Sequence, residues 1–300
     1  MAPAEPLLIW TDPPRELVGF LASYLPLGAI GFQFAVLVPA VGRGGPGATV
    51  LHDASHRAAR IGVIGALCAA LALLISVLNR AGHTGLGFED TVLLLRGQVI
   101  QRLGLVALMA LGFSLALARV RGGWVLAAIG TLWIQLGNLP GVFSGRWPGI
   151  INPLHVLGGS LWIGTLFVLM VAGVGAINAA TAGEAHERNA AIGLLVRKFS
   201  AIALIGAGLL GATGIVTAWR HLHRWSSLWT TPYGWTLDAK LLVVLCIIKL
   251  GHHHWKRVGP TLGTPESITA FRRTAWIELR LAGLVLLITS VLVSLPTPGR

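Results

Sequence analysis

Residues 152–177 read NPLHVLGGSLWIGTLFVLMVAGVGAI and contain no Asp, Glu, Lys or Arg. The hydrocarbon core of a bilayer is about 30 Å thick, and a helix needs about 20 apolar residues to cross it. The segment exceeds this minimum, so it predicts a membrane-spanning helix over residues 153–177. His155 falls at the mouth of that helix, where an ionisable side chain is costly and indicates function.

The composition of the whole chain agrees with a membrane protein. Its 300 residues have a mean hydropathy of +0.75, with 54% hydrophobic and 11% charged residues, which is too apolar for an average soluble domain. We therefore predict an all-α, polytopic membrane helix bundle with about eight transmembrane helices. The expected spans, of which the fourth and seventh are short, cover residues 17–38, 61–78, 99–117, 124–139, 153–177, 199–219, 237–249 and 276–295.

The distribution of basic residues predicts how the chain is oriented. Cytoplasmic connections of membrane proteins are enriched in Lys and Arg, and this enrichment places both termini outside. The net charge of +12 is then explained by the anionic inner face of the membrane, and no nucleic-acid partner is expected. The predicted inner connections hold Arg43, Arg57, Arg60, Arg119, Arg121, Arg188, Arg197, Lys198, Lys256, Arg257, Arg272 and Arg273.

No domain boundary stands out in the sequence. The connections between the expected spans are too short to hold a folded soluble domain, so residues 1–300 are predicted to form a single integral membrane domain. Small residues let membrane helices approach closely. We therefore expect Gly206, Gly208, Gly211 and Gly214 to lie at helix contacts.

The start of the 153–177 segment carries the first candidate site. We expect Asn152 to cap the helix and Pro153 to lie in its first turn, which places His155 about one turn from the outer end. Trp162 follows seven residues later and is expected on the same face. Gly158 and Gly159 leave room beside this face for a neighbouring helix or a flat cofactor. The alternative is a structural histidine that is hydrogen-bonded to a carbonyl group.

Three further histidines are predicted on the outer side. His221 and His223 follow the sixth expected span and can chelate one metal ion if that segment is extended, whereas His83 lies in the connection after the second span. Imidazole is a ligand for Cu(II) and for haem iron. The candidate metal ligands are therefore His155, His221, His223 and His83. In the alternative interpretation, His221 and His223 form a polar rim that faces the lipid headgroups.

Four motifs stand out in the second half of the chain: Asn152 and His155 with Gly158, Gly159, Trp162 and Gly164; Arg197, Phe199 and Ser200; Thr231, Tyr233, Gly234 and Lys240; and Arg272, Arg273 and Glu278. Together these motifs resemble the copper resistance protein D family. The resemblance covers residues 150–296 and implies an eight-helix bacterial inner-membrane protein that handles copper from the periplasm. It assigns the family's histidine to His155 and its tyrosine-glycine-lysine segment to Tyr233, Gly234 and Lys240.

Three functions remain open from the sequence. In the first, the protein binds copper at the periplasmic mouth, receives it as an ion or from a periplasmic copper carrier, and moves it across the membrane. In the second, a haem b or quinone redox protein uses His155 as axial ligand, with Trp162, Tyr233 and Lys240 as further cofactor contacts. In the third, the chain is a non-catalytic subunit that assembles with partner membrane proteins in the lipid bilayer. No catalytic motif is present, so an enzyme is not expected.

Overall fold

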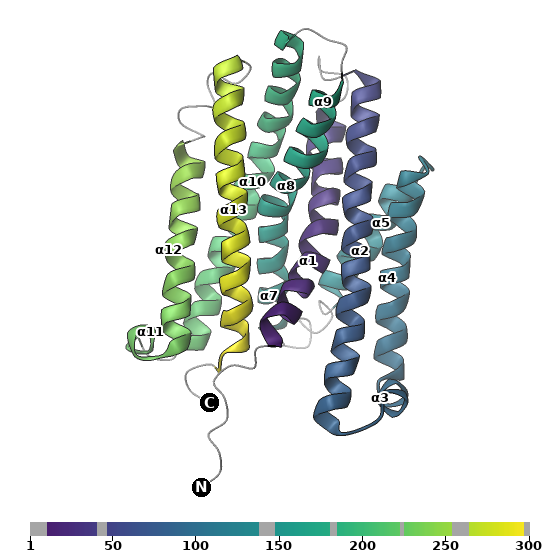
Figure 1. The fold of residues 1–300 in the computed structure, drawn as a ribbon, viewed down its shortest axis with the longest axis vertical. Coiled ribbons are helices and arrows are strands. Elements are labelled where there is room, and N and C mark those ends of the chain that lie inside the picture. Colours follow the sequence, from purple (N-terminus) through teal and green to yellow (C-terminus); the bar gives the residue numbers. More distant parts are fainter. Residues whose placement is uncertain are drawn as a thin grey trace.

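The computed structural model describes residues 11–40, 47–137, 148–180, 185–222, 225–253 and 264–296. Every secondary-structure element in these ranges is a helix, which confirms the predicted all-α class. The helices run side by side as one bundle (Figure 1). In chain order they are α1 (Asp12–Gly31), η1 (Phe32–Leu37), η2 (Val38–Ala40), α2 (Ala48–Thr84), α3 (Phe88–Leu94), α4 (Arg96–Leu117), α5 (Gly123–Leu136), α7 (Pro148–Gly159), η3 (Ser160–Gly164), α8 (Thr165–Val168), η4 (Leu169–Val174), α9 (Gly175–Ala179), α10 (Ala185–Leu222), α11 (Ser227–Thr230), α12 (Pro232–His253) and α13 (Pro265–Ser294).

Six stretches of the described chain are long and apolar enough to cross a membrane, so the protein is a multi-pass membrane protein. Helix α5 is apolar but shorter, and α12 is not among the six because its 22 residues include the charged Asp238, Lys240 and Lys249. These two are the spans that the sequence marks as short, and the count of eight stays a prediction. The six stretches are Asp12–Ala40, Thr49–Thr84, Arg96–Leu117, Gly149–Ala179, Ala185–Arg220 and Pro265–Ser294.

The stretch that decides the fold lies at the centre of the bundle. In Gly149–Ala179, 72% of the most apolar window is buried inside the protein, against 17% in Ala185–Arg220. Helix α1 is the next most buried, and it packs along η3 and α8. Chain segments that are hydrophobic all round belong in an interior rather than at a surface. The uncharged sequence of this segment therefore explains its central place.

Glycine contacts bring these central helices together. A side-chain carbon added to Gly28 of α1 would lie 2.5 Å from the backbone of Gly164, and one added to Gly158 would lie 2.8 Å from the carbonyl oxygen of Gly206 on α10. Such distances are too short for any Cβ, so the two backbones meet only because glycine is present on both sides. The predicted packing role holds for Gly206, whereas Gly208 and Gly211 meet nothing within 4 Å.

Three π-helical turns interrupt the central helices. They are η1 in the first span, and η3 and η4 in the span that begins with α7. A π-turn contains one more residue than the corresponding α-helical turn, so it rotates the faces that follow it. The sequence offered no signal for these turns, and they change which residues of the segment share a face.

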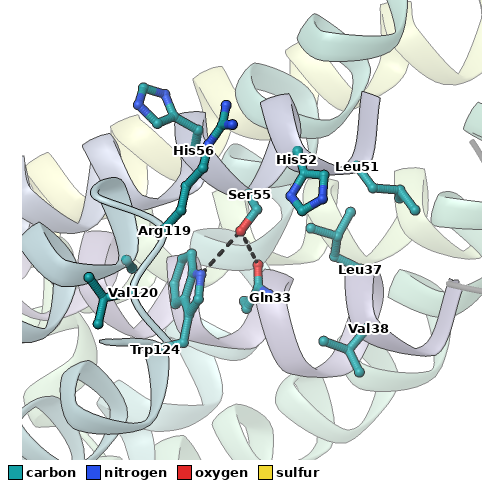
Figure 2. A pocket seen from close by; sticks show the side chains of 11 residues that line it. Gln33, Leu37, Val38, Leu51, His52, Ser55, His56, Arg119, Val120 and Trp124 are labelled. Atoms are coloured by element: carbon teal, nitrogen blue, oxygen red, sulfur yellow. Dashed lines mark hydrogen bonds between the residues drawn. The ribbon is translucent and has the colours of Figure 1, made fainter. Parts of the chain in front are cut away.

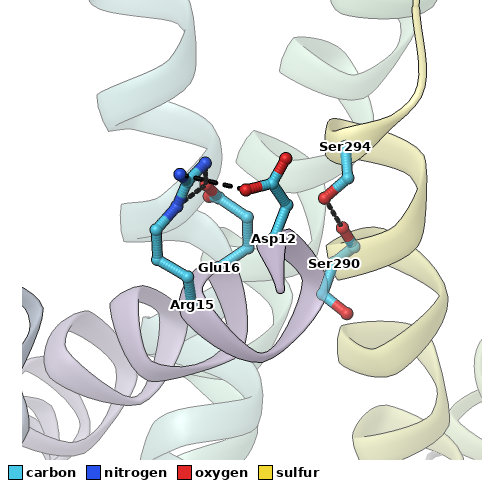
Figure 3. Close-up of polar contacts among 5 residues, drawn as sticks. All are labelled: Asp12, Arg15, Glu16, Ser290 and Ser294. Atoms are coloured by element: carbon cyan, nitrogen blue, oxygen red, sulfur yellow. Dashed lines mark hydrogen bonds and ion pairs between the residues drawn. The ribbon is translucent and has the colours of Figure 1, made fainter. Parts of the chain in front are cut away.

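The first and last helices close the bundle at one end. The beginning of α1 lies beside the end of α13 (Figure 3), and the two helices pack along each other. Arg15 forms ion pairs with Asp12 at 3.1 Å and with Glu16 at 3.0 Å. Acidic groups in the first turn also complement the positive end of the helix dipole. The two ends of the described chain thus lie at the same end of the bundle, and the side of the membrane they face stays a prediction.

Candidate functional site

His155 lies against α10, in the second half of α7. Its ring is partly buried, and its Nδ1 atom is 3.0 Å from the hydroxyl oxygen of Thr213. A side-chain carbon at Gly214 would lie 3.4 Å from Cε1 of the ring, so the imidazole packs over the glycine next to Thr213. The ring therefore packs against two consecutive residues of α10.

The hydroxyl group of Thr213 fixes the role of the histidine nitrogen. The Thr213 hydroxyl donates its proton to the carbonyl oxygen of Leu209, at 2.6 Å. A hydroxyl has one proton, so towards His155 the same oxygen acts as an acceptor. Nδ1 is then the protonated nitrogen of a neutral ring, and Nε2 carries the lone pair. This is the arrangement in which a histidine can bind a metal ion through Nε2 while a neighbouring group orients it.

The structure contradicts the predicted start of this helix, with Asn152 as its cap and Pro153 in its first turn. Helix α7 begins at Pro148, so Asn152 lies inside the helix rather than at its cap, and His155 is about two turns from the start rather than one. Proline at the first position of a helix needs no hydrogen-bond donor and has the required φ angle. Pro148 thus provides an earlier start than Pro153, which lies inside the helix.

The two glycines next to His155 admit neighbouring helices. A side-chain carbon on Gly158 would meet the backbone of α10, and one on Gly159 would meet the hydroxyl group of Tyr24 on α1. The space that these glycines leave is therefore filled by protein on both sides. A flat cofactor against this face, one of the two options open from the sequence, has no room at these two positions.

Trp162 and His155 both lie against α10, but at different heights. Trp162 belongs to the π-turn η3 and has 9% of its surface exposed. A side-chain carbon added to Gly206 of α10 would lie 3.0 Å from the backbone nitrogen of Trp162. Gly206 is seven residues before Thr213 on that helix. Seven residues are about two helical turns. The structure therefore places the indole as a buried packing group two turns away from the imidazole contact.

The tyrosine-glycine-lysine segment divides into a structural part and a charged part. Thr231 caps α12, because its side chain accepts a hydrogen bond from the backbone N–H of Gly234 at 3.0 Å. Gly234 is in contact with the carbonyl groups of Ser227 and Leu228, and Tyr233 is buried with Leu237 and Leu292. Lys240 lies about two turns after Tyr233 on α12, close enough for its charge to reach the His155 ring.

The other predicted metal ligands do not gather around His155 in the part of the chain that the structure describes. His83 is exposed in the last turn of α2. Figure 1 places that end of α2 on the opposite flank of the bundle from the end of α10, where His221 lies. The backbone of His221 is described but its side chain is not, and His223 lies outside the described residues. Among the described residues, no group of three or more His, Cys, Asp or Glu side chains could hold a metal ion.

Thr213, the partner of the histidine, is not among the site residues predicted from the sequence. A signal for it is present, because Thr213, Thr217 and His221 follow each other at four-residue spacing and so share one face of α10. A polar stripe on an apolar membrane helix faces protein rather than lipid. Thr213 is the member of this stripe that lies at the height of His155.

These features define a class of protein: a multi-pass helical membrane protein in which a spanning helix carries one oriented histidine at a contact between helices. The comparison with protein families is more specific. Residues 193–292 match the family model of copper resistance protein D, so this third of the chain is similar to that family, as the motif resemblance predicts. The matched residues include Thr213, Tyr233 and Lys240, and His155 lies before them. Neither the curated proteins nor the solved structures give a match.

Proposed function

We propose that this copper-resistance membrane protein takes up copper as cargo at the outer mouth of the bundle and that His155 is the residue that binds it there. The hydrogen bond between His155 and Thr213 carries the proposal. It gives the imidazole a fixed orientation and places the lone pair on Nε2, which is the nitrogen that we propose as the metal ligand. The family match supplies copper as the metal, and the proposal includes no catalytic step.

The charge near the ring supports a singly charged ion. Lys240 lies close enough for a positive charge on it to reach the His155 ring, and such a charge opposes a metal cation in proportion to the charge of that cation. Cu(I) therefore experiences half of the repulsion that Cu(II) does. We infer that Cu(I) is the form held at this position.

His221 supplies a second position for the ion further out. It lies on the same face of α10 as Thr213 and eight residues later, which is about 12 Å along the helix. Two imidazoles at such different heights suit successive binding of one ion. In this proposal, copper from a periplasmic carrier meets His221 and His223 first and reaches His155 next. A site with a single imidazole holds copper weakly, which favours passage over storage.

Cu(I) binding to the purified full-length protein tests the proposal. We expect His155→Ala to weaken binding at least tenfold, because orienting groups alone change metal affinity by about 10- to 100-fold and this variant removes the ligand itself. The matched control is His83→Ala, which removes an exposed histidine on the other flank and should bind as the unmodified protein does.

Two results would contradict the proposal. Equal Cu(I) binding by His155→Ala and His83→Ala would show that His155 is not a ligand. A Soret band in the purified protein that disappears in His155→Ala would show that the histidine holds a haem group instead.

A further inference from the structure

A cavity of about 390 Å³ lies at the end of the bundle opposite to the beginning of α1 (Figure 2). Its walls come from η1, from the first turns of α2 and from the connection between α4 and α5. This volume is in the range of pockets that hold small ligands. By the distribution of basic residues, this is the end predicted to face the cytoplasm.

A chain of hydrogen bonds holds the three walls together. The indole N–H of Trp124 donates to the hydroxyl oxygen of Ser55 at 3.1 Å, and the Ser55 hydroxyl donates to the amide oxygen of Gln33 at 3.0 Å. Figure 2 shows this chain crossing the floor of the cavity. The amide oxygen of Gln33 is thereby engaged, so the amide presents its NH₂ group, which is a donor.

The side chains at the rim of the cavity are donors or cations. Arg119, His52 and His56 line it, and Figure 2 shows the side chain of Arg119 extending alongside His56. Among the described residues that line the cavity none is acidic, and the neighbouring Asp53 is paired with Arg57 at 2.8 Å. Although His52 and His56 have the spacing of a metal-binding pair, the fixed positive charge of Arg119 repels a metal cation. The rim therefore fits an anion.

Arg119 occupies a backbone position that favours glycine. Its φ angle is +58°, and it is the only residue other than glycine with a positive φ in the described chain. The backbone N–H of Val120 bonds to the oxygen of Leu115, and that of Arg119 to the oxygen of Ala116, which is the hydrogen-bond pattern that ends helices at a left-handed residue. Glycine usually stands there, so a strained arginine indicates that its side chain has a use.

Part of the cavity lining is apolar, and two of its side chains are exposed at the surface of the bundle. Leu37 and Leu51 line this part, together with Val38 and Val120, whose side chains are 49% and 48% exposed. A ligand that fills both parts has an anionic head and hydrocarbon chains. We propose that the cavity binds a phosphate group, held by Arg119 with His52, His56 and the Gln33 amide, and that a phospholipid of the anionic cytoplasmic leaflet is the molecule that carries it.

Native mass spectrometry of the delipidated full-length protein tests this, with phosphatidylglycerol, phosphatidylcholine or inorganic phosphate added. We expect one phosphatidylglycerol to bind, at least tenfold more tightly than phosphatidylcholine. Arg119→Gly should lose at least tenfold in this affinity while its melting temperature stays the same or rises, because glycine suits the φ angle of +58°. His56→Gln is a second variant at the same rim and should weaken binding severalfold.

The matched control is Arg121→Gln, which removes the same charge two residues away, outside the cavity lining. It should bind phosphatidylglycerol as the unmodified protein does. Competition by millimolar inorganic phosphate, lost in Arg119→Gly, would support the phosphate site with free phosphate as its source. Unchanged lipid binding in Arg119→Gly, or equal losses in Arg119→Gly and Arg121→Gln, would overturn the proposal. Cu(I) binding at His155 is unaffected in either case, so this test is independent of the proposed function.

Discussion

The two ends of the bundle are built in opposite ways. At the His155 contact, glycines bring the backbones of α7 and α10 together, and the imidazole packs over Gly214 beside them. At the Arg119 end, the large side chains of Trp124 and Gln33 keep α5, α2 and η1 apart, and a cavity of about 390 Å³ remains. Close contact orients one ligand atom, whereas separated helices enclose a whole molecule. The first end is suited to an ion and the second to a larger anion.

One added methyl group should separate α7 from α10 near His155. Gly206→Ala would place a side-chain carbon 2.7 Å from the carbonyl oxygen of Gly158, so α10 must move away from α7. Overpacking of this kind costs about 1 to 3 kcal/mol, and we expect the melting temperature in detergent to fall by about 5 °C. Cu(I) binding should be lost as well, because the contact that holds His155 opens.

The control for this variant is Gly211→Ala on the same helix. Nothing lies within 4 Å of the added carbon, and alanine is a better helix former than glycine. Its melting temperature should be unchanged or higher. Equal effects of the two substitutions would mean that glycine contacts do not set the distance between α7 and α10.

The orientation of the imidazole can be tested without disturbing the packing. Thr213→Val has nearly the same shape but lacks the oxygen that accepts from Nδ1, so His155 loses its fixed tautomer. We expect Cu(I) affinity to fall about tenfold while phosphatidylglycerol binding stays the same. Isothermal titration with a competing chelator measures the first quantity. Ser200→Ala is the control, because its hydroxyl bonds only to the carbonyl of Val196 in its own helix in the described structure, and a loss there would contradict the assignment.

The smallest expected effect is at the second end. Ser55→Ala removes the hydroxyl that joins Trp124 to Gln33, which costs about 1 kcal/mol and lowers the melting temperature by about 2 °C. Phosphatidylglycerol binding should weaken severalfold and Cu(I) binding should not change. Ser76→Ala, whose hydroxyl bonds to the carbonyl of Leu73 in the same helix, is the control. A loss of copper binding in Ser55→Ala would mean that the two ends are not independent.

Six of the eight expected spans coincide with long apolar helices of the described chain, because length and hydropathy are properties of each helix alone. The sequence predicts the contacts between helices less well. Gly206 and Gly208 are equivalent in a pattern of small residues, yet only the first faces another helix. The direction in which a glycine points depends on how the helix is rotated in the bundle, and no local feature of the sequence records that rotation.

The candidate site was predicted in part for the same reason. His155 and Lys240 could be identified by motif, and the structure brings them within electrostatic reach of each other. Thr213 belongs to another helix and could be recognised only once α7 and α10 were paired. The sequence groups His83 with His155 because both are expected on the outer side, but a shared end of a bundle does not bring two helices together. No sequence motif predicts the cavity around Arg119, because its walls come from three segments that are far apart in the chain.

The π-turn at Ser160–Gly164 has one further consequence for the contact between His155 and Thr213. Such a turn is equivalent to the insertion of one residue into an α-helix, and one residue corresponds to about 100° of rotation. Deleting a residue there would restore the regular helical phase and swing α7 around its axis relative to α8, and the imidazole would leave Thr213. In a related chain without the extra residue, the equivalent histidine would have to find its orienting partner on a different helix.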